Sequence, residues 1–312
     1  MDAAALEKYR RRLGVTGAWS QHLMWLDIPL ERSAVRRIEA LGYGSVWSGE
    51  LIGSKDVFAH TAAVLSSTSR IVYGAGVANV WARHAHTMEA GRATISAAWP
   101  ERFVLGVGIS HERFVEASGQ RYARPLDQLT SYVQDMKAAR GFPRPQQEAP
   151  LVLAALGPRM LERARDLADG AHTYLVTPDH TAQARATLGP DRLLIPAQAV
   201  VLCSDRAEGR RIAHEFVAGY LGLPNYVASL RRLGFDDADL VNGGSERLVD
   251  ALVAYGDEQR VLDRVKEVRA AGADHVLVQP LGPDMSNVIW QLEHLASPLM
   301  DLVTSEPRSA RH

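Results

Sequence analysis

The sequence contains a single cysteine, Cys203, among 312 residues. One thiol excludes an intramolecular disulfide bond and a metal cluster held by cysteines. No stretch approaches the roughly 18 consecutive apolar residues of a membrane-spanning helix. The charged N-terminal segment MDAAALEKYRRRLG also lacks the apolar core of a secretion signal. We therefore expect a cytoplasmic protein that does not have a membrane as a partner.

The sequence also lacks an excess of charge of either sign. Lys and Arg together number 35 and Asp and Glu 36, which gives a net charge of −1. Because no basic stripe is present, nucleic acid is not an expected partner. The length and the 46% hydrophobic content allow a large core and fit one barrel of roughly 250 residues with modest insertions. We expect a single domain over residues 1–312 that acts on a small molecule.

Strand-like and helix-like segments alternate along most of the chain. Helix-like segments that end at glycine or proline separate most of the apolar runs. Eight strands with intervening helices favour a closed (β/α)8 TIM barrel over an open doubly wound sheet. The expected strands are residues 16–20, 45–48, 71–78, 103–108, 151–155, 171–176, 193–202 and 275–279.

The regular period breaks between the seventh and eighth expected strands. Residues 206–256 hold two or three helical patterns where one would suffice. We interpret them as a helical insertion, with a turn at Asn242-Gly243-Gly244.

Polar and aromatic residues directly follow several of these strands. The carboxyl ends of barrel strands meet at the face that carries active sites. His111, after the fourth strand, titrates near neutral pH and is the leading acid/base candidate. Glu50, after the second strand, is the other candidate, although it could instead cap a helix or pair with an arginine. His22, Trp47 and Thr177 are candidate pocket residues. His22 could equally be a loop histidine, and Trp47 could equally be core packing.

The turn Leu156-Gly157-Pro158-Arg159 is a candidate anion cradle. A strand that ends in small residues runs into a helix that begins near proline, so backbone N–H groups and the helix dipole converge there. An ordinary turn between a strand and a helix would use the same residues. His84 and His86 form a His-x-His pair, but no His and Asp constellation completes a site, so we expect no metal.

Four segments carry a resemblance to a known family: residues 42–50, 68–111, 153–181 and 271–282. The second is the most specific, with its order of strand, glycines, helix and the motif LGVG. The sequence resembles the luciferase-like family of flavin and deazaflavin oxidoreductases over roughly residues 14–282. The endings NVWAR and ISH look most like the actinobacterial branch that uses coenzyme F420.

This resemblance implies a set of roles for individual residues. It places a non-proline cis peptide at Gly76-Val77 beneath the cofactor ring, and Asn79 at the polar edge of that ring. It makes His111 the acid/base residue and residues 156–159 the phosphate cradle. Trp81 and Ser110 are also expected beside the cofactor.

The resemblance also implies an activity and an assembly. The expected activity is hydride transfer between F420 and a small organic substrate. The alternatives are an FMN-dependent monooxygenase and a non-catalytic flavin- or deazaflavin-binding protein. The loop after the sixth strand lacks the lysine that sugar-phosphate dehydrogenases of this family use, so a sugar phosphate is not expected. The family further implies a homodimer through residues 57–67 and 84–98.

Overall fold

The computed structural model describes residues 1–140 and 144–305. Eight parallel strands close into a barrel in the order β6-β5-β4-β3-β2-β1-β9-β7, and β6 pairs with β7 to complete the ring. The expected (β/α)8 barrel is confirmed, and each expected strand is present with its ends shifted by at most a few residues. The strands are β1 Thr16–Trp19, β2 Ser45–Ser48, β3 Val72–Asn79, β4 Phe103–Gly108, β5 Leu151–Ala154, β6 Gly170–Thr173, β7 Leu193–Leu202 and β9 Val276–Pro280.

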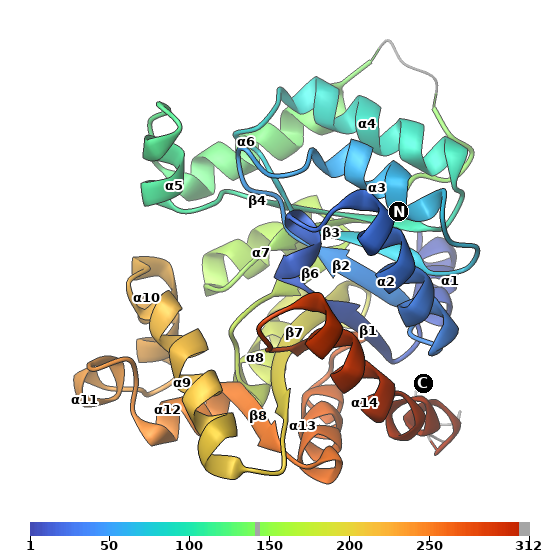
Figure 1. Ribbon diagram of the computed structural model, residues 1–312. Helices are drawn as coiled ribbons and strands as arrows, with labels where there is room; N and C mark the ends of the chain where they lie inside the picture. Colours follow the sequence, from blue (N-terminus) through green and yellow to red (C-terminus); the bar gives the residue numbers. More distant parts are fainter. Residues whose placement is uncertain (141–143, 306–312) are drawn as a thin grey trace.

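Helices surround the barrel on all sides (Figure 1). Many begin at a residue whose side chain accepts hydrogen bonds from the first turn, as Asp56 does for α3. The outer helices are α2 Ile28–Ala40, α3 Val57–Leu65, α4 Ala85–Ala98, α6 Pro125–Ala138, α7 Pro158–Leu167, α8 Pro178–Leu188, α13 Glu258–Ala270 and α14 Met285–Ser305. Two short helices that the sequence analysis did not identify, η1 Gln21–Met24 and α5 Glu112–Ala117, follow β1 and β4.

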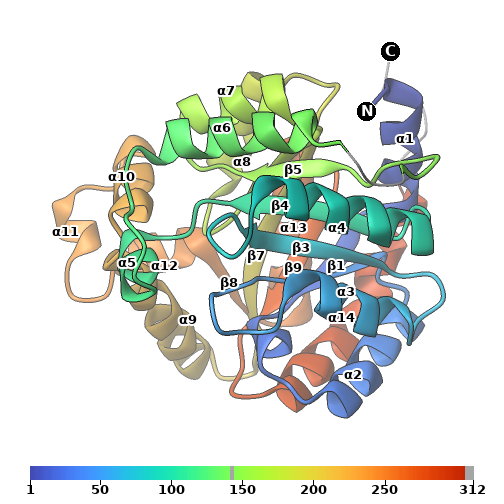
Figure 2. The same ribbon diagram turned by 90° about the horizontal axis from the view of Figure 1, so that it is seen from above.

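Helix α1, Ala3–Leu13, was also not expected, and it packs against one end of the barrel. Its buried residues Leu6, Tyr9 and Leu13 recur every three or four positions and form a cluster with inward-facing strand residues such as Val72 and Val104. Figure 2 shows α1 at the opposite end of the molecule from α5 and α10. A site in the barrel therefore opens towards α5 and α10.

The insertion between β7 and β9 differs in detail from the expectation. It contains four helices, α9 Arg206–Leu221, α10 Pro224–Arg232, α11 Asp237–Leu240 and α12 Glu246–Leu252, where two or three were expected. It ends in a further strand, β8 Val253–Gly256, which pairs with the last residues of β7. This strand was missed because its apolar residues continue the buried side of α12.

Candidate active site

A cavity of about 750 Å³ lies at the carboxyl ends of the barrel strands. Its size is within the range that is typical of small-molecule sites. The barrel loops supply part of its wall, and the insertion helices α9 and α10 supply the rest. Eight of the expected site residues line it: Glu50, Gly76, Val77, Asn79, Ser110, His111, Leu156 and Gly157.

The end of β3 forms a bulge in the cavity wall. The Gly76-Val77 peptide bond is cis, as the resemblance implied. The pairing of β3 with β4 shifts register between Ala75 and Ala78. The Gly76 carbonyl accepts a hydrogen bond of 3.2 Å from Trp19 Nε1, and the Val77 carbonyl accepts one of 3.1 Å from the Glu50 N–H. The bulge is therefore held from β1 and from the loop after β2.

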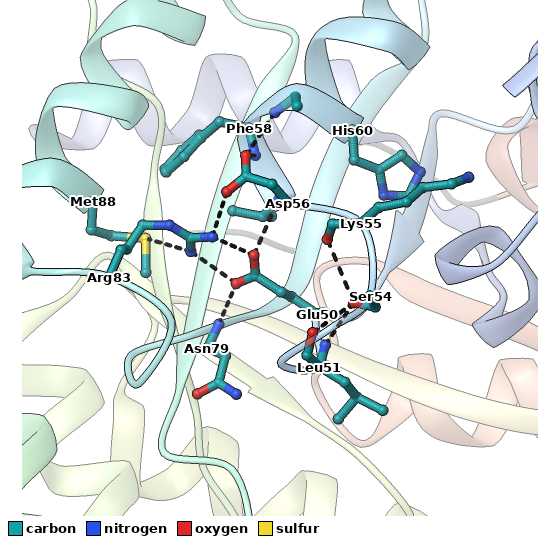
Figure 3. A network of polar contacts seen from close by, with 12 residues as sticks. Glu50, Leu51, Ser54, Lys55, Asp56, Phe58, His60, Asn79, Arg83 and Met88 are labelled. Atoms are coloured by element: carbon teal, nitrogen blue, oxygen red, sulfur yellow. Dashed lines mark hydrogen bonds and ion pairs between the residues drawn. The ribbon is translucent and has the colours of Figure 1, made fainter. Parts of the chain in front are cut away.

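Glu50 is buried and is held by several donors at once (Figure 3). Its carboxylate accepts hydrogen bonds from the backbone N–H groups of Val57 and Asn79, each at 2.9 Å. Both nitrogens at the end of the Arg83 guanidinium also donate to it. Arg83 additionally pairs with Asp56 at 2.8 Å. These contacts are those of a residue that fixes the loop after β2 to the end of β3.

Asn79 presents a free amide group at the cavity. Its Oδ1 accepts a hydrogen bond of 3.0 Å from the Trp81 N–H. Its Nδ2 has no hydrogen-bond partner among the residues that the structure describes, although the residue is buried and lines the cavity. An unpartnered donor at this depth is suited to a polar edge of a bound molecule.

His111 lies at the mouth of the cavity and directly precedes α5. Its Nδ1 is 3.2 Å from Oδ1 of Asn225, and its ring contacts the rings of Phe114 and Tyr226 at centroid distances of 5.9 and 5.6 Å. Burial has the largest effect and lowers the pKa of His111 below 6.5. The Asn225 contact raises this pKa by less than burial lowers it, and the charge of Arg113 lowers it further. The ring is therefore neutral at pH 7.

The start of α7 meets an arginine from the insertion. Gly157 precedes α7, and no side chain caps this helix. Nη2 of Arg232 would lie 3.4 Å from a Cβ placed on Gly157. Arg232 has no acidic partner among the described residues. An uncapped helix start beside an unpaired guanidinium can hold an anion.

Six expected site residues do not lie on the wall of this cavity. Trp47 is fully buried inside the barrel beneath Gly74 and Gly76, and His22 lines a second cavity of about 410 Å³. Thr177 caps α8, and the indole of Trp81 donates to the Ile109 carbonyl at 2.8 Å. The remaining two, Pro158 and Arg159, are exposed in the first turn of α7.

Sequence reasoning missed the contribution of α10. Asn225, Ala228 and Arg232 all line the cavity, and their spacing of three and four places them on one face of the helix. The sequence did contain a signal for this contribution. One face of this insertion helix carries an amide and a cation beside apolar residues. Tyr174, Tyr220 and Tyr226 also line the cavity. They gave no local signal, because Tyr174 follows β6 and the other two lie in the insertion helices.

The described part of the chain holds no group of three or more His, Cys, Asp and Glu that could bind a metal ion. Among the same residues, no helix is both long and apolar enough to pass through a membrane.

Comparisons with known proteins identify the family of this chain and structures that share its fold. A family model described as luciferase-like monooxygenase matches residues 27–275. The chain is 22% identical over 302 residues to 5,10-methylenetetrahydromethanopterin reductase of Methanolobus tindarius, covering 80% of this chain and 90% of that protein.

Solved structures share the fold at low sequence identity. The coenzyme F420-dependent tetrahydromethanopterin reductase of Methanopyrus kandleri matches with a TM-score of 0.76 and 16% identity, over 93% of this chain and 99% of that one. An F420-dependent secondary alcohol dehydrogenase with an F420-acetone adduct matches at 0.74 and 15%, over 91% and 98%. The oxygenating component of 3,6-diketocamphane monooxygenase from Pseudomonas putida, in complex with FMN, matches at 0.66 and 17%, over 91% and 97%.

Proposed function

The chain belongs to the luciferase-like monooxygenase family, and from this membership we propose that it is an oxidoreductase that binds coenzyme F420 and exchanges hydride with a small organic substrate. The observation that carries the proposal is one cavity that combines the bulge at Gly76-Val77, the neutral ring of His111 and the α7–Arg232 cradle. The reductase relative and the two F420-dependent structures favour F420 over FMN.

The residues present fit a flat, phosphorylated cofactor. Gly76 and Gly108 lie on the cavity wall, where a Cβ on Gly76 would press on Trp47 and Trp19 and one on Gly108 would collide with Val77, so the bulge keeps its packing only with glycine at these positions. Asn79 Nδ2 would donate to the polar edge of that ring, and the start of α7 with Arg232 would hold the phosphate. When bound, the deazaflavin supplies the ring carbon that takes hydride from the substrate carbon or returns it.

His111 would accept the proton that leaves the substrate during oxidation. Since its Nδ1 faces the Asn225 oxygen, the neutral ring keeps its proton on Nδ1 and leaves Nε2 as a base. Nε2 would accept the proton that a substrate hydroxyl releases as a carbonyl forms. The reverse reaction requires the protonated ring.

Glu50 would act as a positioning residue in this scheme. Its carboxylate is already occupied by Arg83 and by two backbone N–H groups. It would hold Asn79 and the bulge in place without transferring a proton itself.

We also propose that the protein is a cytoplasmic homodimer. Its one thiol, Cys203, is unpaired, which suits a reducing compartment. α4 carries small residues, of which Ala97 is exposed. Gly91 does not contribute to that surface, because it packs against Phe58 of α3 within the same chain.

The test is a titration of the protein with F420 and with FMN, followed by absorbance and fluorescence. Arg232→Ala is expected to weaken F420 binding about ten- to hundredfold, the usual effect of losing a charge-assisted hydrogen bond. Arg231→Ala is the matched control, because Arg231 is exposed like Arg232 but pairs with Asp237 and does not line the cavity. It should leave the affinity unchanged.

The outcomes separate the alternatives. Tight binding of FMN without binding of F420 would replace this proposal with an FMN-dependent monooxygenase. Binding of F420 with no hydride transfer to any alcohol or carbonyl would instead indicate a non-catalytic binding protein.

A further inference from the structure

A continuous series of aromatic rings runs along one side of the cavity. Trp19, whose indole donates to the Gly76 carbonyl, contacts Tyr174 at a centroid distance of 5.2 Å. Tyr174 contacts Tyr220 at 5.5 Å, and Tyr220 contacts Tyr226 at 5.1 Å. Tyr226 then contacts His111 at 5.6 Å. We name these five residues the aromatic belt; all of them line the cavity.

The hydroxyl groups of the belt are not equivalent. The Tyr174 hydroxyl accepts a hydrogen bond of 2.8 Å from Gln279 and shares one of 2.9 Å with the Tyr220 hydroxyl. The Tyr226 hydroxyl has no hydrogen-bond partner within the described chain, although Tyr226 is only 7% exposed. Because Tyr226 lines the cavity, its unpartnered hydroxyl is available to a bound molecule that supplies an acceptor.

Charge is scarce where a substrate would meet the belt. The charged side chains on the described cavity wall are Glu50, Arg113 and Arg232. Glu50 is neutralised by Arg83, and the Arg113 guanidinium lies 4.5 Å from the centre of the Phe114 ring. Arg232, the last residue of α10, lies beside Gly157 at the start of α7, where the cofactor phosphate is proposed to bind. Arg113 acts on the His111 end of the belt, so a charged group at the far end of a substrate whose oxygen lies beside His111 would have no counter-ion, which is costly.

We propose that the substrate is an uncharged, planar aryl alcohol or aryl ketone, stacked on the aromatic belt with its oxygen held by the Tyr226 hydroxyl beside His111. This inference rests on the proposed function and narrows its substrate class. In the alcohol, the same oxygen would accept a hydrogen bond from Tyr226 and release its proton to His111. The rings of the belt favour flat molecules because offset and edge-to-face contacts add to the area that is buried.

Three ketones of similar size test the proposal by isothermal titration calorimetry, with the F420-loaded protein and with the cofactor-free protein. Acetophenone is flat and uncharged, 4-acetylbenzoate adds a carboxylate, and cyclohexyl methyl ketone replaces the flat ring. Acetophenone is expected to bind at least about tenfold more tightly than 4-acetylbenzoate and about two- to tenfold more tightly than cyclohexyl methyl ketone.

Tyr226→Phe isolates the hydroxyl. It should weaken acetophenone binding about fivefold, the usual effect of one neutral hydrogen bond, and leave F420 binding unchanged. Tyr122→Phe removes a half-exposed hydroxyl elsewhere on the cavity wall and should change neither affinity.

Several results would overturn the substrate class: 4-acetylbenzoate binding as tightly as acetophenone, Tyr226→Phe behaving like Tyr122→Phe, or no acetophenone binding to protein that holds F420. Failure of F420 itself to bind would count against the proposed function instead. The order of the three ketones on the cofactor-free protein would still decide the substrate class.

Discussion

Nδ1 of His111 lies 3.2 Å from Oδ1 of Asn225, a residue 114 positions further along the chain. The barrel therefore provides the titrating ring, and the insertion provides the group that orients it. With the Asn225 oxygen as acceptor, the neutral ring would carry its proton on Nδ1 and leave Nε2 as the base.

His111→Ala should lower the turnover of a substrate alcohol by about 10²–10⁴-fold, the usual contribution of a positioned base. Cofactor affinity should change little. In the native protein, alcohol oxidation should rise with pH through the pKa of His111, which burial holds below 6.5, because only the neutral ring accepts a proton. Full turnover in His111→Ala would show that His111 only lines the pocket and does not transfer the proton.

Asn225→Ala should shift that pH profile to lower pH. The Asn225 contact raises the pKa of His111, so its loss leaves the effect of burial less opposed. A rate–pH profile at saturating substrate measures the shift. An unmoved profile with reduced stability would indicate that Asn225 serves only the packing of α10.

Glu50→Gln should destabilise the protein by about 3 kcal/mol, because it removes the buried one of the two carboxylates that pair with Arg83. Asp56→Asn is the control. Asp56 is the exposed partner of the same arginine, and an asparagine can still cap α3, so its cost should stay within about 1 kcal/mol. Urea unfolding of both variants gives the comparison, and equal losses would contradict the positioning role of Glu50.

Two glycine substitutions should have opposite effects. A Cβ at Gly106 would collide with the Ala75 carbonyl at the bulge, so Gly106→Ala should destabilise by about 2 kcal/mol or more. Gly219 lies inside α9 with open space around it, so Gly219→Ala should stabilise by roughly 0.5–1 kcal/mol. Thermal melting curves measure both, and a neutral Gly106→Ala would show that the bulge adapts.

Stability should fall as the pH is lowered from about 6.5 towards 4. Burial lowers the pKa of His275 to about 4, and its two ring nitrogens contact the Ser45 hydroxyl and the Gly14 carbonyl. In this range the unfolded chain binds a proton that the folded chain does not, so His275 contributes about 1.4 kcal/mol per pH unit. Urea unfolding at pH 6 and pH 5 should show a smaller difference for His275→Gln than for the native protein.

The homodimer is tested by light scattering coupled to size exclusion. At micromolar concentration the mass should be twice 34.2 kDa. A monomer of 34.2 kDa would rule the dimer out.

The barrel could be predicted from the sequence because its strands and helices are set by local patterns. The run Phe103–Gly108 is apolar and ends in glycine, and it forms β4 over the same residues. α1 was missed because it is rich in charged residues, and its apolar face is limited to Leu6, Tyr9 and Leu13. These three residues are recognisable as a buried face only when the helix is packed against the barrel. β8 was missed because four residues after a helix are too few to show a period.

The candidate site could be predicted only where it follows strand ends. His111, Asn79 and the bulge at Gly76-Val77 lie in the cavity as expected. Trp47 does not, because a four-residue strand gives no sign of which side chains turn inward beneath a glycine. Tyr226 and Arg232 could not be identified, since their roles depend on how the insertion folds back over the barrel.

Helix α10 has nine residues, and it contributes Asn225 and Tyr226 from its start and Arg232 from its last position to the cavity wall. A short helix moves as one body. A ligand that draws Arg232 towards α7 thus also restricts the groups around His111, and a ligand held at Tyr226 restricts Arg232 in return. The affinities for the two ligands should therefore be coupled by the same factor in both directions, and this helix would be the element through which cofactor binding prepares the protein for its substrate.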